Sequence, residues 1–402
     1  MEKKKKLVQI NTVFYASTGR IMADIQQYAE TQGYDTISFV GRGPASTRIK
    51  GKVFGNPVSF WSHVILTTLF DAQGYGSYFA TKKLIRWLRE EKPDIIHLHN
   101  LHGYYLHIPT LCRYLRDEYK GEVFWTFHDC WPVTGHCAYF TAVNCNKWKS
   151  ECQGCPQKKV YPISFLCDGS RRNFRMKQKW FRQIPNLTII APSEWIGDIV
   201  KESFLKDRCV EVVHNGIDLS IFHPDRGKDI WKKYYVDPNK KILLGVANIW
   251  DKRKGLDDFL SLAMSLPDEY HIVLVGLTKR QIRKLPDNIT GIERTSDTEE
   301  LVKIYSSADI FINPSVEESF SLVTVEAMAC GIPVIVLDTS AVKELVDEIS
   351  GLVLNKHRVQ DYMKAIQKIE RQNLQRGTVR ARAEKFDKNR QVEEIIKLYK
   401  TI

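Results

Sequence analysis

Short apolar runs alternate with longer amphipathic stretches along almost the whole chain. Runs such as 7–15, 123–127 and 333–337 are rich in β-branched and aromatic residues, as expected of strands buried on both faces. The stretches between such runs, for example 21–31 and 296–307, have helical periodicity. Strands that alternate with helices in this way predict α/β domains built on parallel sheets.

The most informative stretch is 313–336, NPSVEESFSLVTVEAMACGIPVIV. It predicts the end of a strand, a loop, a helix that ends at Gly331 before Pro333, and a second strand. A loop at the carboxyl end of a parallel strand is a common ligand site, and a helix that starts there presents N–H groups to a phosphate. Glu318 and Glu326 flank the helix start, and their carboxylates can accept hydrogen bonds from sugar hydroxyls.

This stretch resembles the Glu-x7-Glu signature of glycosyltransferase family 4, whose members are retaining enzymes with the GT-B fold. The likeness covers both glutamates, the Pro-Ser before them and the Glu-Ala-Met-Ala-Cys-Gly-x-Pro-Val run. It implies two doubly wound, Rossmann-like parallel-sheet domains that face a central cleft. The first would be an acceptor-side domain over 1–220 and the second a nucleotide-sugar-binding domain over 221–385, with a last helix, 386–402, packed back onto the first.

On the donor side, the resemblance implies that Lys254 and Arg253 bind the diphosphate, although the family's arginine usually lies earlier in this loop. Glu318 would bind donor-sugar hydroxyls, Glu326 the ribose hydroxyls, and the strand edge near Thr295 the base. The residues implied in donor binding are Arg253, Lys254, Thr295, Glu318, Ser319, Phe320, Ser321, Leu322 and Glu326. Of these, Lys254 and Glu318 would also be catalytic.

Histidines lie near the ends of two predicted strands of the first domain. His97 and His99 lie in the strand 93–100, and His128 directly follows the strand 123–127. The resemblance implies that His128 is catalytic and lies beside the reacting sugar carbon. It places His97 and His99 on the acceptor side.

The loop between the first strand and the helix 21–31 is rich in small residues. Ser17 or Thr18 is expected to cap that helix. The resemblance places Gly19 and Arg20 on the acceptor side, where Arg20 would contact a phosphate. An exposed surface arginine fits this position equally well.

Four cysteines lie in an insertion over 130–156, with the spacing C-x7-C-x6-C-x2-C. They are Cys137, Cys145, Cys152 and Cys155. The terminal C-x2-C is half of a common zinc site. Because the chain has 9 cysteines, an odd number, a disulfide framework is not expected. A structural zinc ion and a loop of reduced cysteines are the two interpretations. Catalysis should require no cofactor, since the sequence lacks the Asp-x-Asp motif that holds metal in the other major glycosyltransferase fold.

The chain is basic, with 59 Lys and Arg against 47 Asp and Glu, for a formal net charge of +12. This balance favours phosphorylated substrates or an anionic membrane surface as partners, and no nucleic-acid module is present. The apolar segment 57–70 fits a buried helix, which we favour, or a surface that touches lipid. Neither a membrane span nor a signal-peptide cleavage site is found. We expect a cytoplasmic protein that is peripheral at the inner face of the cell membrane.

Together these observations predict a hexosyltransferase-type glycosyltransferase. It would move a sugar, with retention, from a nucleotide-diphosphate sugar to a glycan or lipid-linked oligosaccharide in bacterial surface polysaccharide synthesis. One alternative is a GT-B enzyme that modifies a nucleotide sugar without transfer, such as an epimerase. Another is a non-catalytic sugar-nucleotide-binding protein.

Overall fold

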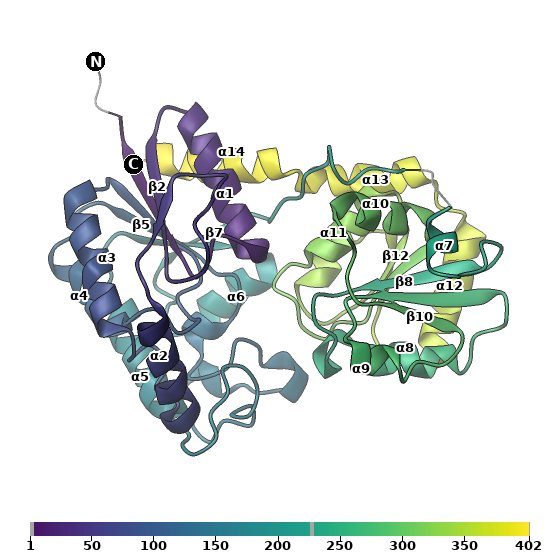
Figure 1. Ribbon diagram of the computed structural model, residues 1–402, viewed down its shortest axis with the longest axis horizontal. Coiled ribbons are helices and arrows are strands. Elements are labelled where there is room, and N and C mark those ends of the chain that lie inside the picture. The colour runs from purple at the N-terminus through teal and green to yellow at the C-terminus, as the bar shows by residue number, and fades with distance from the viewer. Residues whose placement is uncertain (1–3, 226–228, 402) are drawn as a thin grey trace. The chain divides into compact units, whose positions relative to one another are not determined.

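The computed structural model describes residues 4–225 and 229–401, so the first three residues of the lysine-rich start lie outside it. The chain divides into two units, shown in Figure 1. The first extends to His214 and includes the chain again from Val392, and the second contains Asn215–Gln391. Each unit has its own parallel sheet, so the predicted pair of α/β domains is confirmed.

The first sheet has seven strands in the order β3-β2-β1-β4-β5-β6-β7, and every neighbouring pair is parallel. Its strands are β1 (Lys6–Asn11), β2 (Asp35–Val40), β3 (Gly51–Val53), β4 (Ile95–Leu98), β5 (Glu122–Thr126), β6 (Leu187–Ala191) and β7 (Cys209–Val212). The strand order reverses between β1 and β4. Ligands in such sheets bind at the carboxyl ends of the strands that flank this switch point.

Helices cover both faces of the first sheet (Figure 1). They are α1 (Ala16–Thr31), α2 (Pro57–Phe70), α3 (Tyr78–Glu91), α4 (Ile108–Asp117), α5 (Ser170–Phe181) and α6 (Glu194–Glu202), together with the later part of α14 (Lys388–Lys400). Short 3-10 helices η1 (Trp131–Val133), η2 (Thr141–Val143) and η3 (Lys147–Lys149) lie in the cysteine-rich segment.

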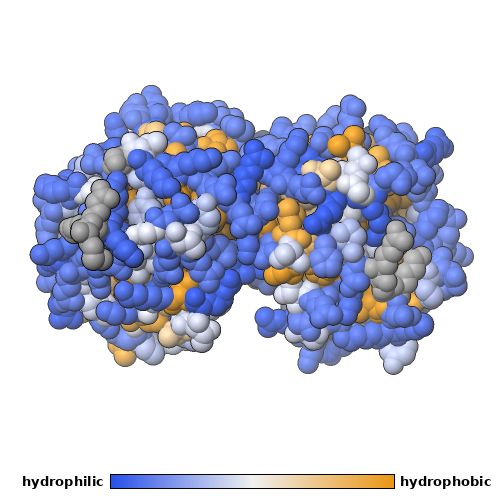
Figure 2. All heavy atoms as spheres, turned by 90° about the horizontal axis from the view of Figure 1, so that it is seen from above, coloured by the Kyte–Doolittle hydropathy of each residue, from blue (hydrophilic) through white to orange (hydrophobic). Residues whose placement is uncertain are grey.

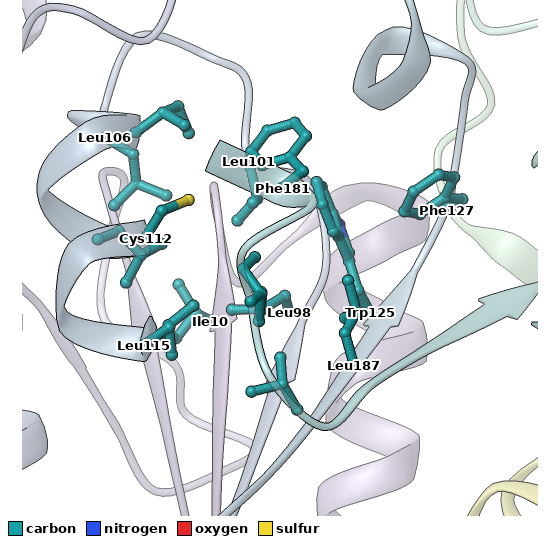
Figure 3. Close-up of a cluster of buried hydrophobic side chains, with 14 of the residues drawn as sticks. Ile10, Leu98, Leu101, Leu106, Cys112, Leu115, Trp125, Phe127, Phe181 and Leu187 are labelled. Carbon is teal, nitrogen blue, oxygen red and sulfur yellow. The ribbon is translucent and has the colours of Figure 1, made fainter. Parts of the chain in front are cut away.

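Side chains alternate between the two faces along each central strand. On one face, Ile10 and Leu98 meet Cys112 and Leu115 of α4, and Trp125 packs beside them (Figure 3). All five are almost completely buried. This apolar packing holds the strand ends in fixed positions, so residues that follow β1, β4 and β5 are delivered to one edge of the sheet.

The second sheet has six parallel strands in the order β10-β9-β8-β11-β12-β13. Its strands are β8 (Lys241–Val246), β9 (Tyr270–Val275), β10 (Ile289–Ile292), β11 (Ile310–Asn313), β12 (Val334–Leu337) and β13 (Gly351–Leu354). Its helices are α7 (Ile230–Lys233), η4 (Lys252–Lys254), α8 (Leu256–Ala263), α9 (Lys279–Ile282), α10 (Thr298–Ser307), α11 (Leu322–Ala329), η5 (Ala341–Leu345), α12 (Val359–Gln372), α13 (Arg376–Ala383) and η6 (Glu384–Phe386). Here the strand order reverses between β8 and β11.

The start of α1 differs from the prediction. The helix begins at Ala16, so Ser17 and Thr18 lie in its first turn, and its N-cap, Tyr15, makes no side-chain capping hydrogen bond. Gly19 explains this start, because a Cβ there would lie 2.4 Å from the backbone carbon of Phe14. Close backbone packing against the preceding loop therefore replaces side-chain capping.

The prediction of a buried helix over 57–70 is also wrong in part. The segment is helical, but His63 and Thr67 are its only buried residues. The face of the molecule in Figure 2 is mostly hydrophilic, with smaller apolar areas. No helix within residues 4–225 and 229–401 is long and apolar enough to cross a bilayer.

Candidate functional site

The loop between β11 and α11 is fixed by one side chain at the end of the strand. The Asn313 amide nitrogen donates to the hydroxyls of Ser321 and Thr324, both at 2.9 Å, and its oxygen accepts from the Ser315 N–H at 3.2 Å. These bonds tie both ends of the loop to the start of α11. The N–H groups of that helix start point toward the carboxyl edge of the sheet, which suits an anion. Gly331, with φ of +80°, follows the helix end as predicted.

A second loop, after β8, meets this one at the switch point of the sheet. The Arg253 guanidinium donates to the Glu317 carbonyl at 2.8 Å, and the Val316 N–H donates to the Arg253 carbonyl at 2.9 Å. The Lys254 ammonium forms an ion pair with the Glu318 carboxylate. Both side chains are largely buried, with exposed fractions of 18% and 11%. The structure therefore brings together Arg253, Lys254 and Glu318, the cations and one carboxylate that the sequence nominated.

Gly255 allows the two loops to approach. Its φ is +74°, and a Cβ there would lie 2.6 Å from the ring of Pro314 in the β11 loop. Any larger residue would strain the backbone and clash with Pro314. The run Arg253-Lys254-Gly255 is thus held by backbone geometry as well as by charge.

Glu326 lies within α11 and is buried. Its carboxylate accepts a hydrogen bond from the Tyr305 hydroxyl at 3.1 Å. Burial, and then the charge of Glu326, raise the pKa of Tyr305 well above its usual value, so the phenol stays a donor. Sequence reasoning missed Tyr305, which lies in the predicted helix 296–307 and could have been suggested only by its single polar atom on an apolar helix face. Thr295 is half-buried, three residues beyond β10.

In the first unit, the three histidines form one stack at the carboxyl edge of the sheet. The ring centroids of His97 and His99 are 4.3 Å apart, and those of His99 and His128 are 5.4 Å apart. His97 is hydrogen-bonded through Nδ1 to the Tyr399 hydroxyl, at 2.5 Å, and through Nε2 to the Thr126 hydroxyl, at 2.7 Å. His97 and His99 are fully buried, so neither ring can contact an acceptor directly, and both instead support His128.

Hydrogen bonds assign the tautomer of His128. The Gln9 amide nitrogen donates to the Met22 carbonyl, so its oxygen accepts from His99 Nε2 at 3.0 Å. A neutral His99 then accepts at Nδ1 from His128 Nε2, at 3.1 Å. The proton of neutral His128 is therefore on Nε2. Gln9, a polar residue inside an apolar strand, was a signal in the sequence that we did not use.

Burial keeps this stack neutral. It lowers the pKa of His97 to about 3 and that of His128 to about 4, although the charge of Asp129 opposes the second shift. The pKa of His99 is also well below its usual value, chiefly because of burial. An uncharged His128 can therefore lie beside developing positive charge without repelling it.

Gly19 and Arg20 lie in the first turn of α1, after β1 and therefore beside the switch point of the first sheet. Gly19 is buried and packs on the Phe14 backbone. Arg20 is exposed. An acceptor contact of these two residues stays a prediction.

The four cysteines of the insertion line one small cavity, together with Phe140 and Trp148. The side chains of Cys137 and Cys155 are hydrogen-bonded to each other, and the Cys152 sulfur accepts from the Gly135 N–H at 3.2 Å. Within the described part of the chain, no group of three or more His, Cys, Asp or Glu side chains is arranged to hold a metal ion. The structural zinc therefore stays a prediction, and the geometry adds no support for it.

Comparisons with known proteins agree with this architecture. The sequence model of glycosyltransferase family 4 matches residues 18–221, which is 204 of the 402 residues, and that of glycosyl transferases group 1 matches residues 240–372. The putative colanic acid biosynthesis glycosyl transferase WcaC of Escherichia coli (strain K12) is 24% identical over 304 residues, 74% of this chain and 72% of that relative. A D-inositol 3-phosphate glycosyltransferase of Mycolicibacterium gilvum (strain PYR-GCK) is 34% identical over 161 residues, 37% of this chain and 36% of its own length.

Solved structures show the same fold at low identity. Sucrose-phosphate synthase from Thermosynechococcus elongatus has a TM-score of 0.73 and 17% identity over 99% of both chains. Anabaena HepE, solved in complex with UDP and glucose, has a TM-score of 0.70 and 15% identity over 99% of this chain and 100% of its own. Because the family model spans more than half of the chain and both sheets have the expected topology, the protein belongs to glycosyltransferase family 4 and is a glycosyltransferase with the GT-B fold.

Proposed function

We propose that the chain transfers a sugar from a nucleotide-diphosphate sugar to a glycan or lipid-linked oligosaccharide in bacterial surface polysaccharide synthesis, with retention at the anomeric carbon. The observation that carries this proposal is the ion pair of Lys254 and Glu318 beside the start of α11. A cation, a carboxylate and a helix amino terminus at one sheet switch point suit a phosphate and the sugar hydroxyls next to it. HepE, solved with UDP and glucose, and WcaC, named for colanic acid biosynthesis, support the donor class and the pathway.

The leaving diphosphate is neutralised by this cluster. Lys254 and Arg253 offset its charge as the bond between the sugar carbon and the phosphate oxygen breaks, and N–H groups at the start of α11 add to this effect. Glu318 positions the Lys254 ammonium and accepts hydrogen bonds from sugar hydroxyls. Glu326, oriented by Tyr305, accepts hydrogen bonds from the ribose.

The acceptor hydroxyl forms the new bond to the same carbon. Its proton passes to the departing diphosphate oxygen, so the products are a glycoside and a nucleoside diphosphate. His128 lies beside the oxocarbenium-like carbon. Its neutral ring matters because an imidazolium there would oppose the positive charge of the transition state.

A thermal-shift screen of nucleotide sugars, followed by a transfer assay with the selected donor, tests this proposal. Transfer yields free nucleoside diphosphate and a new glycoside, whereas an epimerase yields an isomeric nucleotide sugar and a binding protein yields neither. Glu318→Gln should lower transfer by about 10²- to 10³-fold, while Glu348→Gln, at an exposed position, should not. Near-wild-type transfer by Glu318→Gln would refute the assignment, and NMR of the product's anomeric proton tests retention.

We extend the proposal to attachment at an anionic membrane surface, because a lipid-linked acceptor requires the enzyme to work there. The formal net charge of +12 suits such a surface.

A further inference from the structure

Helix α2 exposes apolar side chains that most helices bury. Its sequence, PVSFWSHVILTTLF, has no acidic or basic residue apart from one histidine, yet only His63 and Thr67 are buried. Trp61, for example, is 61% exposed. An apolar helix on the surface of a protein indicates a binding face, because its exposure to water is unfavourable.

Two neighbouring segments extend this surface. Ser77, at the start of α3, is bonded to the ring of His63 at 3.0 Å, which places the start of α3 against α2. On the other side, the Phe165 N–H donates to the Thr68 carbonyl at 2.7 Å, and the Cys167 N–H donates to the Leu69 carbonyl at 3.2 Å. The exposed large side chains that form what we term the α2 apolar face include Val58, Trp61, Ile65, Phe79, Phe165 and Leu166.

The inner side of α2 is fixed, so this face is already built. His63 lies against Gly76, where a Cβ would approach the imidazole to 2.3 Å. The Asn56 side chain caps the helix by accepting from the Ser59 N–H at 2.9 Å. The apolar side chains therefore have no inward alternative, and exposure is a property of the folded unit.

The charges around the α2 apolar face are mostly positive, although the exposed Asp168, whose carboxylate accepts from the N–H groups of Cys155 and Ser170, directly follows it. The segments 57–70, 77–83 and 156–167 contain no aspartate or glutamate, and their only charged residues are four lysines. These are Lys82, Lys83, Lys158 and Lys159. Lysines beside exposed Trp, Phe and Leu are typical of proteins that lie on anionic lipid. A second copy of the chain fits less well, because a symmetric contact would bring the same lysines together.

We propose that the α2 apolar face docks on an anionic bilayer, with its apolar side chains at the headgroup boundary and its four lysines on lipid phosphates. The inference rests on the proposed function in one respect, because a lipid-linked acceptor is the reason why docking would be useful. The α2 apolar face would bring the first unit to that acceptor.

Co-sedimentation of the full chain with vesicles tests this directly. The wild type should pellet at low salt with phosphatidylcholine vesicles that contain phosphatidylglycerol and much less with phosphatidylcholine alone. The double variant Trp61→Ser/Phe79→Ser should lower the partition coefficient at least tenfold. A matched control, Tyr235→Ser/Met264→Ser, replaces residues of the second unit that are 97% and 81% exposed and should pellet like the wild type.

The charge component is tested separately by Lys82→Glu/Lys83→Glu, which should remove the preference for phosphatidylglycerol. Docking on lipid is refuted if the wild type stays in the supernatant, or if the Trp61/Phe79 variant pellets as well as the control. It is also refuted if light scattering shows a dimer without lipid that this variant dissociates, since the face would then bind a second copy.

Donor hydrolysis without vesicles separates the two proposals. A chain that pellets with anionic vesicles but neither hydrolyses nor transfers any donor would keep the docking surface and refute the proposed function. A chain that transfers sugar but does not pellet would do the reverse.

Discussion

Replacing Lys254 with methionine should remove transfer while leaving the fold in place. The Lys254 side chain is 82% buried beside Glu318, and methionine keeps most of the side-chain length. At a separation of ~4 Å and an effective dielectric constant of about 20, one unit charge stabilises another by about 4 kcal/mol. After desolvation, about 3 to 4 kcal/mol remains for a preorganised group, or about 10²- to 10³-fold in kcat/KM.

The assay should also separate catalysis from stability. Lys254→Met leaves the Glu318 carboxylate buried without its cation, which should lower the free energy of unfolding by about 1 to 3 kcal/mol. The double variant Lys254→Met/Glu318→Gln removes that uncompensated charge, so stability should recover. Transfer should not recover, because the diphosphate still lacks the ammonium.

Lys252 provides the matched control. It lies in the same 3-10 helix but is exposed, so Lys252→Met should change kcat/KM by less than about twofold. If both lysine variants lost activity equally, general charge would be responsible rather than the Lys254 position. If Lys254→Met transferred sugar nearly as well as the wild type, the reasoning from the ion pair would be wrong.

Acid should destabilise the first unit. Burial lowers the pKa of His97 to about 3 and that of His128 to about 4. Both imidazole rings therefore bind a proton more readily in the unfolded chain than in the folded one. Their contribution to stability is complete above about pH 6.5 and falls by about 2 kcal/mol per histidine at pH 5. It goes on falling to about pH 4 for His128 and about pH 3 for His97. An unfolding free energy that is flat from pH 7.5 to 5 would contradict this reasoning. Separately, Tyr305→Phe removes the hydroxyl that donates to Glu326. It should raise the Kd for the donor's nucleoside diphosphate by about fivefold, and isothermal titration that shows an unchanged Kd would exclude this role.

The second unit was predictable because its signals are local. The run 333–337 is apolar in sequence and contains β12, and Gly331 follows the end of α11 where a left-handed residue was expected. The partners Arg253, Lys254 and Glu318 could be nominated from their motifs. That Lys254 and Glu318 form an ion pair depends on the neighbouring positions of β8 and β11, which no local pattern contains.

The first unit was less predictable because tertiary contacts override its local signals. Hydroxyl side chains at 17 and 18 suggested a cap, but the approach of Gly19 to Phe14 determines where α1 begins. Its apolar composition led us to predict that α2 is buried. An apolar sequence, however, cannot indicate whether its partner is protein or lipid. His97 and His99 were recognised as a cluster, but their order in the hydrogen-bond chain requires the β1–β4 pairing.

The return of α14 to the first unit affects synthesis. Ile395, Ile396 and Tyr399 cover one face of the first sheet. The Tyr399 hydroxyl is hydrogen-bonded to His97, which lies 302 positions earlier. A ribosome releases these residues long after the strands that they cover, so the amino-terminal half of the chain emerges with an unprotected apolar face. The first unit therefore cannot reach its native state until α14 has emerged, and a chain cut short before α14 would be damaged in the part that was made first.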